Sequence, residues 1–284
     1  MTATIFIYND VELAYHYEIF ETFIVQCKRY FNLPDSTDVK IFLYFRPNKS
    51  YEEYITKKYP NLILDTPKHY DYYINCTIYD KNVDVIKNSG KHMYISHEIT
   101  PRLLKYDNVF YLTPLSNKNY IRTNILPYSD ERKVGSIPIY IIQGSIRQSR
   151  RNYNLLDKIL SRNYSKQFII KIIGKINKKK HVPPIIETFK SKITMKSNLD
   201  FTDFHKEFID AYCLLPLISK CSHPQYYTNK LTSSMNYATA YNLKCVIDKD
   251  LQGIYNLENA YVYDNEDDIV AAFEKSLMDF RCQE

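Results

Sequence analysis

The chain has 284 residues, a length that suits one large domain or two ordinary ones and allows a substantial core. With 45% hydrophobic and 25% charged residues, the composition is typical of a globular protein and excludes disorder, collagen and coiled coil. No run of about 18 uncharged apolar residues occurs, so no transmembrane segment is expected. The first residues lack the basic start of a secretory signal, and the six cysteines form no CxxC pair. We therefore expect a reduced, cytoplasmic protein.

The net charge of +6 is unevenly distributed. Between Arg147 and Lys196 there are 14 Lys and Arg residues against two acidic residues, so this stretch carries +12 and the rest −6. Such a stretch is either a solvated basic face or an anion site, for nucleotide phosphate or nucleic acid. The chain shows no zinc pattern, no RNP-like aromatic motif and no basic heptad region, the usual signs of nucleic-acid modules.

Apolar and amphipathic segments alternate along the first half of the chain. Strands are predicted at residues 4–8, 39–45, 71–78, 92–96 and 109–112, and helices at 11–31, 51–59 and 82–88. Residues 114–136 are polar and irregular and contain Pro114, Pro127 and Gly135, which is typical of a linker.

The alternation restarts in the second half. Strands are predicted at residues 137–143, 167–173, 193–195, 213–218, 244–247 and 261–263, and helices at 152–160, 203–210, 230–241 and 267–280. Strands that alternate with helices favour parallel sheets covered on both faces. The expected fold is therefore α/β, with two Rossmann-like domains at residues 1–134 and 135–284 whose sheets face a cleft. In such sheets, ligands bind beyond the carboxyl ends of the strands.

Several common catalytic motifs are missing. The sequence contains no GxGxxG, GxxxxGK[ST], GxSxG or HExxH, which argues against dinucleotide oxidoreductases, P-loop NTPases, common serine hydrolases and zinc proteases. Asp248-Lys-Asp250 follows a strand and could hold a divalent metal between two phosphates. A surface turn is the better interpretation, so we expect neither a metal nor a cofactor.

A glycine and three arginines follow the first strand of the second half. The strand ends at Gly144, and a short loop then carries Ser145, Arg147, Arg150 and Arg151. Glycine lets the backbone approach a ligand closely, and arginine binds phosphate oxygens bidentately. The alternative is a glycine turn followed by arginines that face water.

Hydroxyl groups and a lysine gather at the predicted start of the helix at 230–241. This second group comprises Tyr227, Lys230, Thr232, Ser233 and Ser234. Backbone N–H groups at a helix N-terminus, together with hydroxyls and a lysine, make a phosphate site. The alternative is plain N-capping by Thr228 or Asn229.

Two further strand ends carry candidate residues. The strand at 167–173 ends at Gly174, an edge that in a nucleotide-binding domain can lie beneath the base. In the first half, the strand at 92–96 is followed by His97 and Glu98, which could bind a sugar hydroxyl and act as a general base. A histidine near a strand end can equally be structural.

Residues 139–156 resemble the opening of the donor-binding domain of GT-B glycosyltransferases, especially glycosyltransferase family 4. In that family a strand and a glycine loop are followed by a basic residue about six positions on, where this chain has Arg150. The run FIIKIIGK is similar to the family's next strand, residues 211–216 to the strand that leads to the site, and residues 229–234 to the segment before the diphosphate-binding helix. His97 falls where these enzymes often place a histidine in the cleft.

The chain departs from the family in one feature. The pair of glutamates separated by seven residues is absent, since no Glu lies between Glu207 and Glu258. This departure puts the family's usual ribose and sugar contacts in doubt. The composition is similar to that of proteins from giant DNA viruses.

The resemblance implies metal-independent transfer of a sugar from a nucleotide-diphosphate sugar to a glycan, protein or lipid acceptor. Arg147, Arg150 and Lys230 would neutralise the diphosphate, the hydroxyls of residues 232–234 would bind its oxygens, and His97 and Glu98 would act on the acceptor side. On this interpretation, nucleic acid is not expected as a partner. Two alternatives stay open: a non-catalytic nucleotide- or partner-binding protein, and a nucleic-acid-binding protein that uses residues 147–196. The sugar, the base, the anomeric outcome and the oligomeric state are not predicted.

Overall fold

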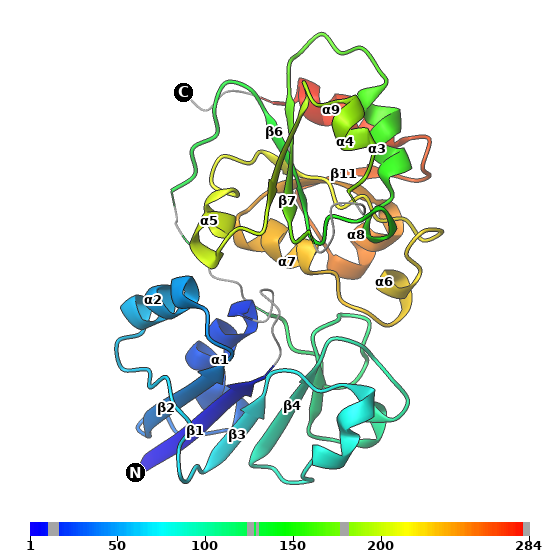
Figure 1. Ribbon diagram of the computed structural model, residues 1–284. Coiled ribbons are helices and arrows are strands. Elements are labelled where there is room, and N and C mark those ends of the chain that lie inside the picture. The colour runs from blue at the N-terminus through cyan, green and yellow to red at the C-terminus, as the bar shows by residue number, and fades with distance from the viewer. Residues whose placement is uncertain (11–16, 124–127, 129–130, 177–181, 281–284) are drawn as a thin grey trace. The chain divides into compact units, whose positions relative to one another are not determined.

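The structure is a computed structural model that describes residues 1–284 except 11–16, 124–127, 129–130, 177–181 and 281–284 (Figure 1). The chain divides into two compact units: unit 1 is Met1–Leu126 with Asn229–Leu231, and unit 2 is Pro127–Thr228 with Thr232–Glu284. Each unit is built around one fully parallel sheet with helices, which confirms the predicted α/β class with two parallel-sheet domains. No helix among the described residues is long and apolar enough to cross a membrane.

Unit 1 contains a five-stranded sheet in the order β2-β1-β3-β4-β5. Its strands are β1 (Thr2–Asn9), β2 (Asp38–Phe45), β3 (Tyr72–Asn75), β4 (His92–Ser96) and β5 (Val109–Tyr111). Its helical elements are α1 (Tyr17–Tyr30), α2 (Lys49–Lys58) and the short 3₁₀ helices η2 (Asp80–Val85) and η3 (Leu103–Lys105).

Aromatic and aliphatic side chains from one face of this sheet pack against α1 and α2. Ile5 and Ile7 of β1 are fully buried. The Phe45 ring of β2 lies 5.8 Å from Phe20 of α1 and 5.1 Å from Tyr51 of α2. β4 pairs in parallel with β3 and β5, and His97 and Glu98 follow its last residue at the carboxyl edge of the sheet.

Unit 2 contains a six-stranded sheet in the order β11-β10-β9-β6-β7-β8. Its strands are β6 (Ile139–Gln143), β7 (Ile169–Gly174), β8 (Ile193–Ser197), β9 (Cys213–Leu214), β10 (Lys244–Asp248) and β11 (Ala260–Tyr263). Its helices are η4 (Gln148–Arg150), α3 (Tyr153–Leu160), α4 (Ile185–Thr188), α5 (Phe201–Lys206), α6 (Gln225–Thr228), α7 (Ser233–Ala240), α8 (Lys249–Tyr255) and α9 (Ile269–Met278).

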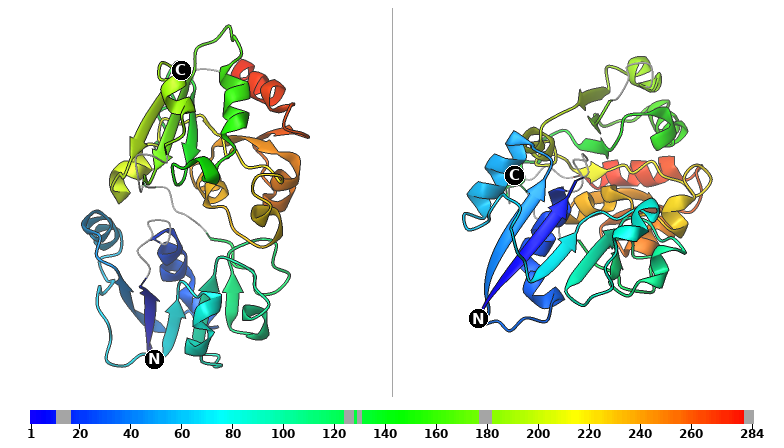
Figure 2. Two further views of the ribbon diagram at one scale, coloured as in Figure 1. Left: turned by 45° about the vertical axis from the view of Figure 1, so that its right-hand side comes forward. Right: turned by 60° about the horizontal axis from the view of Figure 1, so that its bottom comes forward.

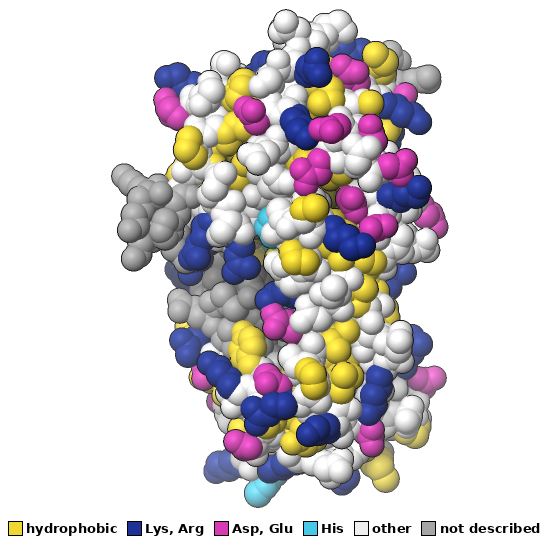
Figure 3. Space-filling view, turned by 90° about the vertical axis from the view of Figure 1, so that its right-hand side faces the viewer, with side chains coloured by type: hydrophobic (Ala, Val, Ile, Leu, Met, Phe, Trp, Pro, Cys, Tyr) yellow, Lys and Arg dark blue, Asp and Glu magenta, His cyan; other side chains and the backbone are white. Residues whose placement is uncertain are grey.

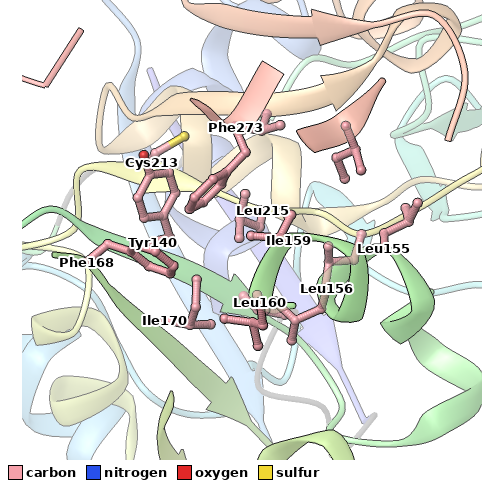
Figure 4. Packing of buried hydrophobic residues seen from close by; sticks show 14 of the residues in the cluster. Tyr140, Leu155, Leu156, Ile159, Leu160, Phe168, Ile170, Cys213, Leu215 and Phe273 are labelled. Carbon is pink, nitrogen blue, oxygen red and sulfur yellow. The ribbon is translucent and has the colours of Figure 1, made fainter. Parts of the chain in front are cut away.

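The core of unit 2 forms between β6, β7 and two helices, α3 and α9, which lie side by side (Figure 2). The ring of Tyr140 on β6 lies 4.4 Å from that of Phe273 on α9, and Phe168 completes the aromatic group at 5.0 Å from Phe273 (Figure 4). Leu155 and Leu156 of α3 are fully buried in the same cluster. This core includes Tyr140 and Ile142 of β6 and so anchors the strand close to its end.

Replacing Tyr140 by phenylalanine is expected to lower the free energy of unfolding of unit 2 by about 1 kcal/mol. The Tyr140 hydroxyl shares a 2.8 Å hydrogen bond with the Ser276 hydroxyl, which also donates to the Phe273 carbonyl at 2.6 Å. The variant keeps the ring and loses only this bond. Urea unfolding would measure the change, with Tyr79→Phe at an exposed position as control. Equal stabilities of the two variants would contradict the expectation.

The structure corrects several predicted elements. Of the helix expected at 11–31, α1 covers 17–30, and residues 11–16 lie outside the described part. The segment 82–88 is not an α-helix, because η2 is a 3₁₀ helix with an irregular residue, Asn82. The strand at 213–218 is only the two residues of β9. The helices α4, α6 and α8 were not predicted.

Asp248 explains why α8 begins where it does. Its carboxylate accepts a hydrogen bond from the backbone N–H of Leu251 at 3.2 Å, so it is the N-cap of α8. Asp250 pairs with Lys220 at 3.3 Å. The Asp-x-Asp sequence is therefore a helix start, close to the surface turn favoured from the sequence.

Two lysines of the basic stretch are neutralised by acidic residues within unit 2. Lys171 is buried on β7 and forms ion pairs with Glu207 at 3.0 Å and Asp210 at 2.7 Å. Lys196 pairs with Glu207 at 2.7 Å. Burial opposes ionisation of Glu207, but hydrogen bonds from Lys196 and Lys171 outweigh it and lower the pKa of Glu207. On the face shown in Figure 3, acidic and basic side chains are interspersed over much of the surface.

Candidate functional site

The candidate anion site of unit 2 lies where β6 ends. Gly144, the first residue after β6, has φ of 133°, a value that favours glycine. Its N–H donates to the Ile173 carbonyl at 3.0 Å, and the Ile146 N–H donates to the Lys175 carbonyl at 3.0 Å. The loop that follows β6 therefore runs along the end of β7.

Gly174 is required by this close approach. Its φ is 156°, and a Cβ built on it would collide with the carbonyl oxygen of Gly144 and lie 2.6 Å from the carbonyl carbon. The structure thus gives Gly174 a packing role, as the residue that lets two backbone segments touch. Its predicted place beneath a nucleotide base stays a prediction.

Arg151 is buried beneath the loop, with only 7% of its surface exposed. Its Nη1 donates to the Arg150 carbonyl at 2.7 Å, and its Nη2 donates to the Gln143 carbonyl and to the Ser234 hydroxyl, the latter at 3.2 Å. The guanidinium carbon Cζ lies 3.1 Å from where a Cβ on Gly144 would stand. Arg151, predicted as a donor-binding residue, therefore acts inside the protein.

The N-terminus of α7 lies against the end of β6. The Ser234 hydroxyl, fully buried, donates to the side-chain oxygen of Gln143 at 3.0 Å. Thr232 is the N-cap residue, but its side chain makes no capping bond, and its N–H donates to the Tyr255 hydroxyl at 2.9 Å. The helix begins at Ser233, so the predicted start at 230 is wrong, and Thr228 and Asn229 do not cap this helix.

Arg147 and Arg150 lie on the same loop, at the ends of η4. Arg147 is half-buried and Arg150 is exposed. The Nε atom of Arg147 is buried without a hydrogen-bond partner among the described residues. Across the described chain, no acidic side chain forms an ion pair with Arg147, Arg150 or Arg151. The loop therefore keeps its positive charge, whereas the lysines of β7 and β8 are neutralised.

His223 supports this loop from the segment that follows β9. Its Nε2 lies 3.3 Å from the Ser149 carbonyl, and its Nδ1 lies 2.7 Å from the Ser222 hydroxyl. Burial lowers the pKa of His223, and the charges of Arg151 and Arg150 lower it further. His223 is therefore neutral near pH 7.

Tyr227 lies inside unit 2. It is buried, its hydroxyl donates to the Ile218 carbonyl at 3.3 Å, and burial and the nearby Asp248 raise its pKa. Leu217, one residue before Ile218, has φ of 50° and accepts a hydrogen bond from the Asn152 N–H at 2.7 Å. These contacts assign Tyr227 to packing of the segment after β9.

The remaining predicted residues come together in unit 1. The Ile99 N–H donates to the Asn229 carbonyl at 2.8 Å, and the Leu231 N–H donates to the His97 carbonyl at 3.2 Å. Residues 229–231 thus form a short antiparallel bridge with residues 97–99. Within this bridge the Lys230 ammonium group forms an ion pair with the Glu98 carboxylate.

His97 lies next to this ion pair and is half-buried. Burial and the charge on Lys230 lower its pKa to about 4, against an opposing contribution from the backbone of Cys76. His97 is therefore neutral near pH 7. A neutral imidazole can accept or donate a hydrogen bond, whereas a pKa this low makes it a weak base.

The structure thus sorts the predicted residues into two groups. Unit 2 brings together Gly144, Ser145, Arg147, Arg150, Arg151, Gly174, Thr232, Ser233 and Ser234 around the ends of β6 and β7. Unit 1 brings together His97, Glu98 and Lys230. Sequence reasoning missed Gln143 and His223. Gln143 could have been noticed as a candidate, because the strand Ile139–Gln143 is otherwise apolar apart from the Tyr140 hydroxyl. Among the described residues, no group of three or more His, Cys, Asp or Glu side chains could hold a metal.

Comparisons with known proteins give a fold match without a sequence match. No family model and no curated protein matches the chain. AviGT4, a glycosyltransferase involved in avilamycin A biosynthesis, is similar with a TM-score of 0.64 and 9% identity over 99% of this chain and 89% of that one. Sucrose-phosphate synthase from Thermosynechococcus elongatus gives a TM-score of 0.58 and 8% identity, covering 98% and 90%.

A glycosyltransferase from Rickettsia africae gives a TM-score of 0.56 and 9% identity, covering 98% of this chain and 88% of that one. These likenesses show the fold alone: the chain has the two-domain α/β fold of GT-B glycosyltransferases.

Proposed function

We propose that the protein is a glycosyltransferase that uses a nucleotide-diphosphate sugar and works without a metal ion. The observation that carries this proposal is the pairing of the arginine-bearing loop after β6 with the N-terminus of α7, fixed through Gln143, Arg151 and Ser234. This pairing lies at the carboxyl edge of a parallel sheet, where ligands of such folds bind.

The described groups at this edge suit a diphosphate. Arg147 and Arg150 carry positive charge that no acidic residue of the described chain neutralises. The first turn of α7 offers backbone N–H groups and the positive end of the helix dipole, beside the hydroxyl of Ser233. Charge that develops on a leaving diphosphate would be stabilised by these preorganised donors, which replace a metal ion.

In unit 1 we assign Glu98 and His97 to the sugar acceptor. The ion pair with Lys230 orients the Glu98 carboxylate, so Lys230 serves this carboxylate rather than the diphosphate. His97, neutral because its pKa is about 4, is suited to hydrogen-bond an acceptor hydroxyl. Acceptors with hydroxyl groups include glycans, hydroxylated lipids and protein side chains.

A thermal-shift screen tests the donor class. UDP, GDP, CDP, dTDP and their common sugars would be compared with and without EDTA. A ligand at about 100 times its Kd adds roughly 2.7 kcal/mol of stability. A shift from one nucleotide family that EDTA leaves unchanged supports the proposal. The absence of any shift at millimolar ligand overturns it.

Substituting Arg150 by alanine is expected to weaken binding of the matching nucleoside diphosphate by about 1.5–3 kcal/mol, the value of a hydrogen bond to a charged group. This equals roughly a 10- to 150-fold rise in Kd. Isothermal titration calorimetry would measure it, with Arg162→Ala, an exposed arginine of the same basic stretch, as the matched control. An unchanged affinity in Arg150→Ala would exclude the assignment of this residue.

A non-catalytic nucleotide-binding protein is the second candidate, favoured by the missing glutamate pair. It predicts the same nucleotide shift without transfer or hydrolysis of any donor sugar. Nucleic-acid binding is less favoured, because Lys171 and Lys196 of the basic stretch are neutralised by Glu207 and Asp210. It predicts affinity for DNA or RNA that falls steeply with salt.

A further inference from the structure

Arg151 is a buried cation that contacts no carboxylate among the residues the structure describes. Its hydrogen-bond acceptors are two backbone carbonyls and the Ser234 hydroxyl, with a further bond to Tyr226. Its Nε is buried with no partner among the described residues. Removing a charge from water without an opposite charge is costly, and burial accordingly lowers the pKa of Arg151. A neutral side chain would fill this space at lower cost, which points to a role beyond stability.

The guanidinium joins three elements, of which β6 and η4 are close in sequence and α7 lies 83 positions away. Through Gln143 it holds the end of β6, through the Arg150 carbonyl it holds η4, and through Ser234 it holds the first turn of α7. The planar fork of an arginine can serve these acceptors together, whereas the point charge of a lysine lacks that geometry.

The surroundings of the guanidinium favour an anion bound at the neighbouring loop. Arg147 and Arg150, on the same loop, add two positive charges, and the neighbouring His223 is neutral because burial lowers its pKa. Gly144 leaves open the space that the guanidinium occupies, since a Cβ there would collide with Nη2. The site is therefore built around a fixed buried charge.

We propose that Arg151 is a positioning residue, which locks the loop after β6 to the N-terminus of α7 so that both present their donors to a diphosphate. This inference rests on the proposed function. Arg151 itself does not touch the ligand. It holds Arg147, Arg150 and the first turn of α7 in one arrangement before the ligand arrives, which reduces the ordering cost of binding.

The test uses inorganic pyrophosphate as the probe and the full chain. Arg151→Lys keeps the positive charge and loses the planar guanidinium, so any change in Kd reports the geometry of the hydrogen bonds and not the charge. We expect its Kd for pyrophosphate to rise at least about tenfold, as for the loss of one charged hydrogen bond, at temperatures where circular dichroism shows the variant folded. Arg162→Lys, the matched exchange at an exposed arginine of the same stretch, is expected to bind like wild type.

Ser234→Ala provides a second variant in case Arg151→Lys does not fold. It removes one acceptor of the guanidinium and keeps every positive charge. We expect a rise in Kd of about three- to tenfold. In the double variant with Arg151→Lys, the loss is expected to be smaller than the sum of the two single losses, because both variants remove the bond between Arg151 and Ser234. A purely structural effect on stability would leave the affinity of the folded fraction unchanged and would not show this coupling.

The outcomes separate this inference from the proposed function. If wild type binds pyrophosphate and both variants bind equally well, or if their losses simply add, the positioning role is overturned and the diphosphate site stands. If wild type binds neither pyrophosphate nor any nucleoside diphosphate, the proposed function fails and the inference with it.

Discussion

Gly174→Ala is expected to lower the free energy of unfolding of unit 2 by about 4 kcal/mol or more. Losses of this size are typical of severe steric or backbone strain. The added Cβ would collide with the Gly144 carbonyl oxygen, and the φ of 156° is one that side chains rarely adopt. Neither segment can yield easily. Gly144 is tied to the Ile173 carbonyl at 3.0 Å, and the guanidinium of Arg151 lies on its other side.

Urea unfolding of unit 2, followed by hydrogen exchange of its strands, would measure this loss. Gly253→Ala is the matched control, because this glycine lies in α8 and a Cβ there meets nothing within 4 Å. Alanine in a helix is expected to add about 0.5–1 kcal/mol relative to glycine. The two substitutions should therefore have opposite signs, and similar stabilities would refute the packing role of Gly174.

Gly144 and Gly174 show which part of the site the sequence could predict. Both glycines were singled out because each ends a strand and glycine is scarce in this chain, and both lie at the predicted edge. The structural reason for these glycines was not predictable, since the contact joins residues 30 positions apart at the ends of two neighbouring strands. Local patterns indicate where strands end. They do not indicate which backbone segments touch.

Lys230 shows where the pattern fails. Residues 230–241 have the composition of one helix. In the structure, however, residues 229–231 form a β-bridge with residues 97–99, and the helix starts at Ser233. Backbone hydrogen bonds to a segment more than 100 positions away override the local preference. The strand predicted at 92–96 has the bounds of β4, in which four of five residues are buried, so here the local pattern and the tertiary structure agree.

Ser234 and Arg151 were predicted as ligand contacts from their residue types, their places after a strand and at a helix start, and the family resemblance. The hydroxyl and the guanidinium instead bind each other and Gln143, all three buried. Phosphate binding at this helix start stays a prediction, and burial decides which donors remain for a ligand. Arg147, Arg150 and the first turn of α7 keep theirs.

His97→Gln is expected to remove a large part of the acid sensitivity of unit 1. The ordinary pKa of 6.5 falls to about 4 in the folded protein, because burial and the charge on Lys230 disfavour the imidazolium. Between these values the unfolded chain binds a proton that the folded protein does not. Stability is thus complete above the unfolded pKa and declines as the pH falls from 6.5 towards 4, by about 3 kcal/mol in total.

Urea unfolding at pH 7.5 to 4, followed by hydrogen exchange of β1 and β4, would compare wild type with His97→Gln. Carboxylates contribute to acid unfolding in both proteins, so the difference between the two profiles isolates His97. His69→Gln replaces a histidine at an exposed position and serves as the matched control. Parallel profiles for wild type and His97→Gln would mean that His97 is not held neutral. Its assignment as a neutral hydrogen-bonding partner of an acceptor hydroxyl would then fall as well, since that role depends on the imidazole staying uncharged beside Lys230.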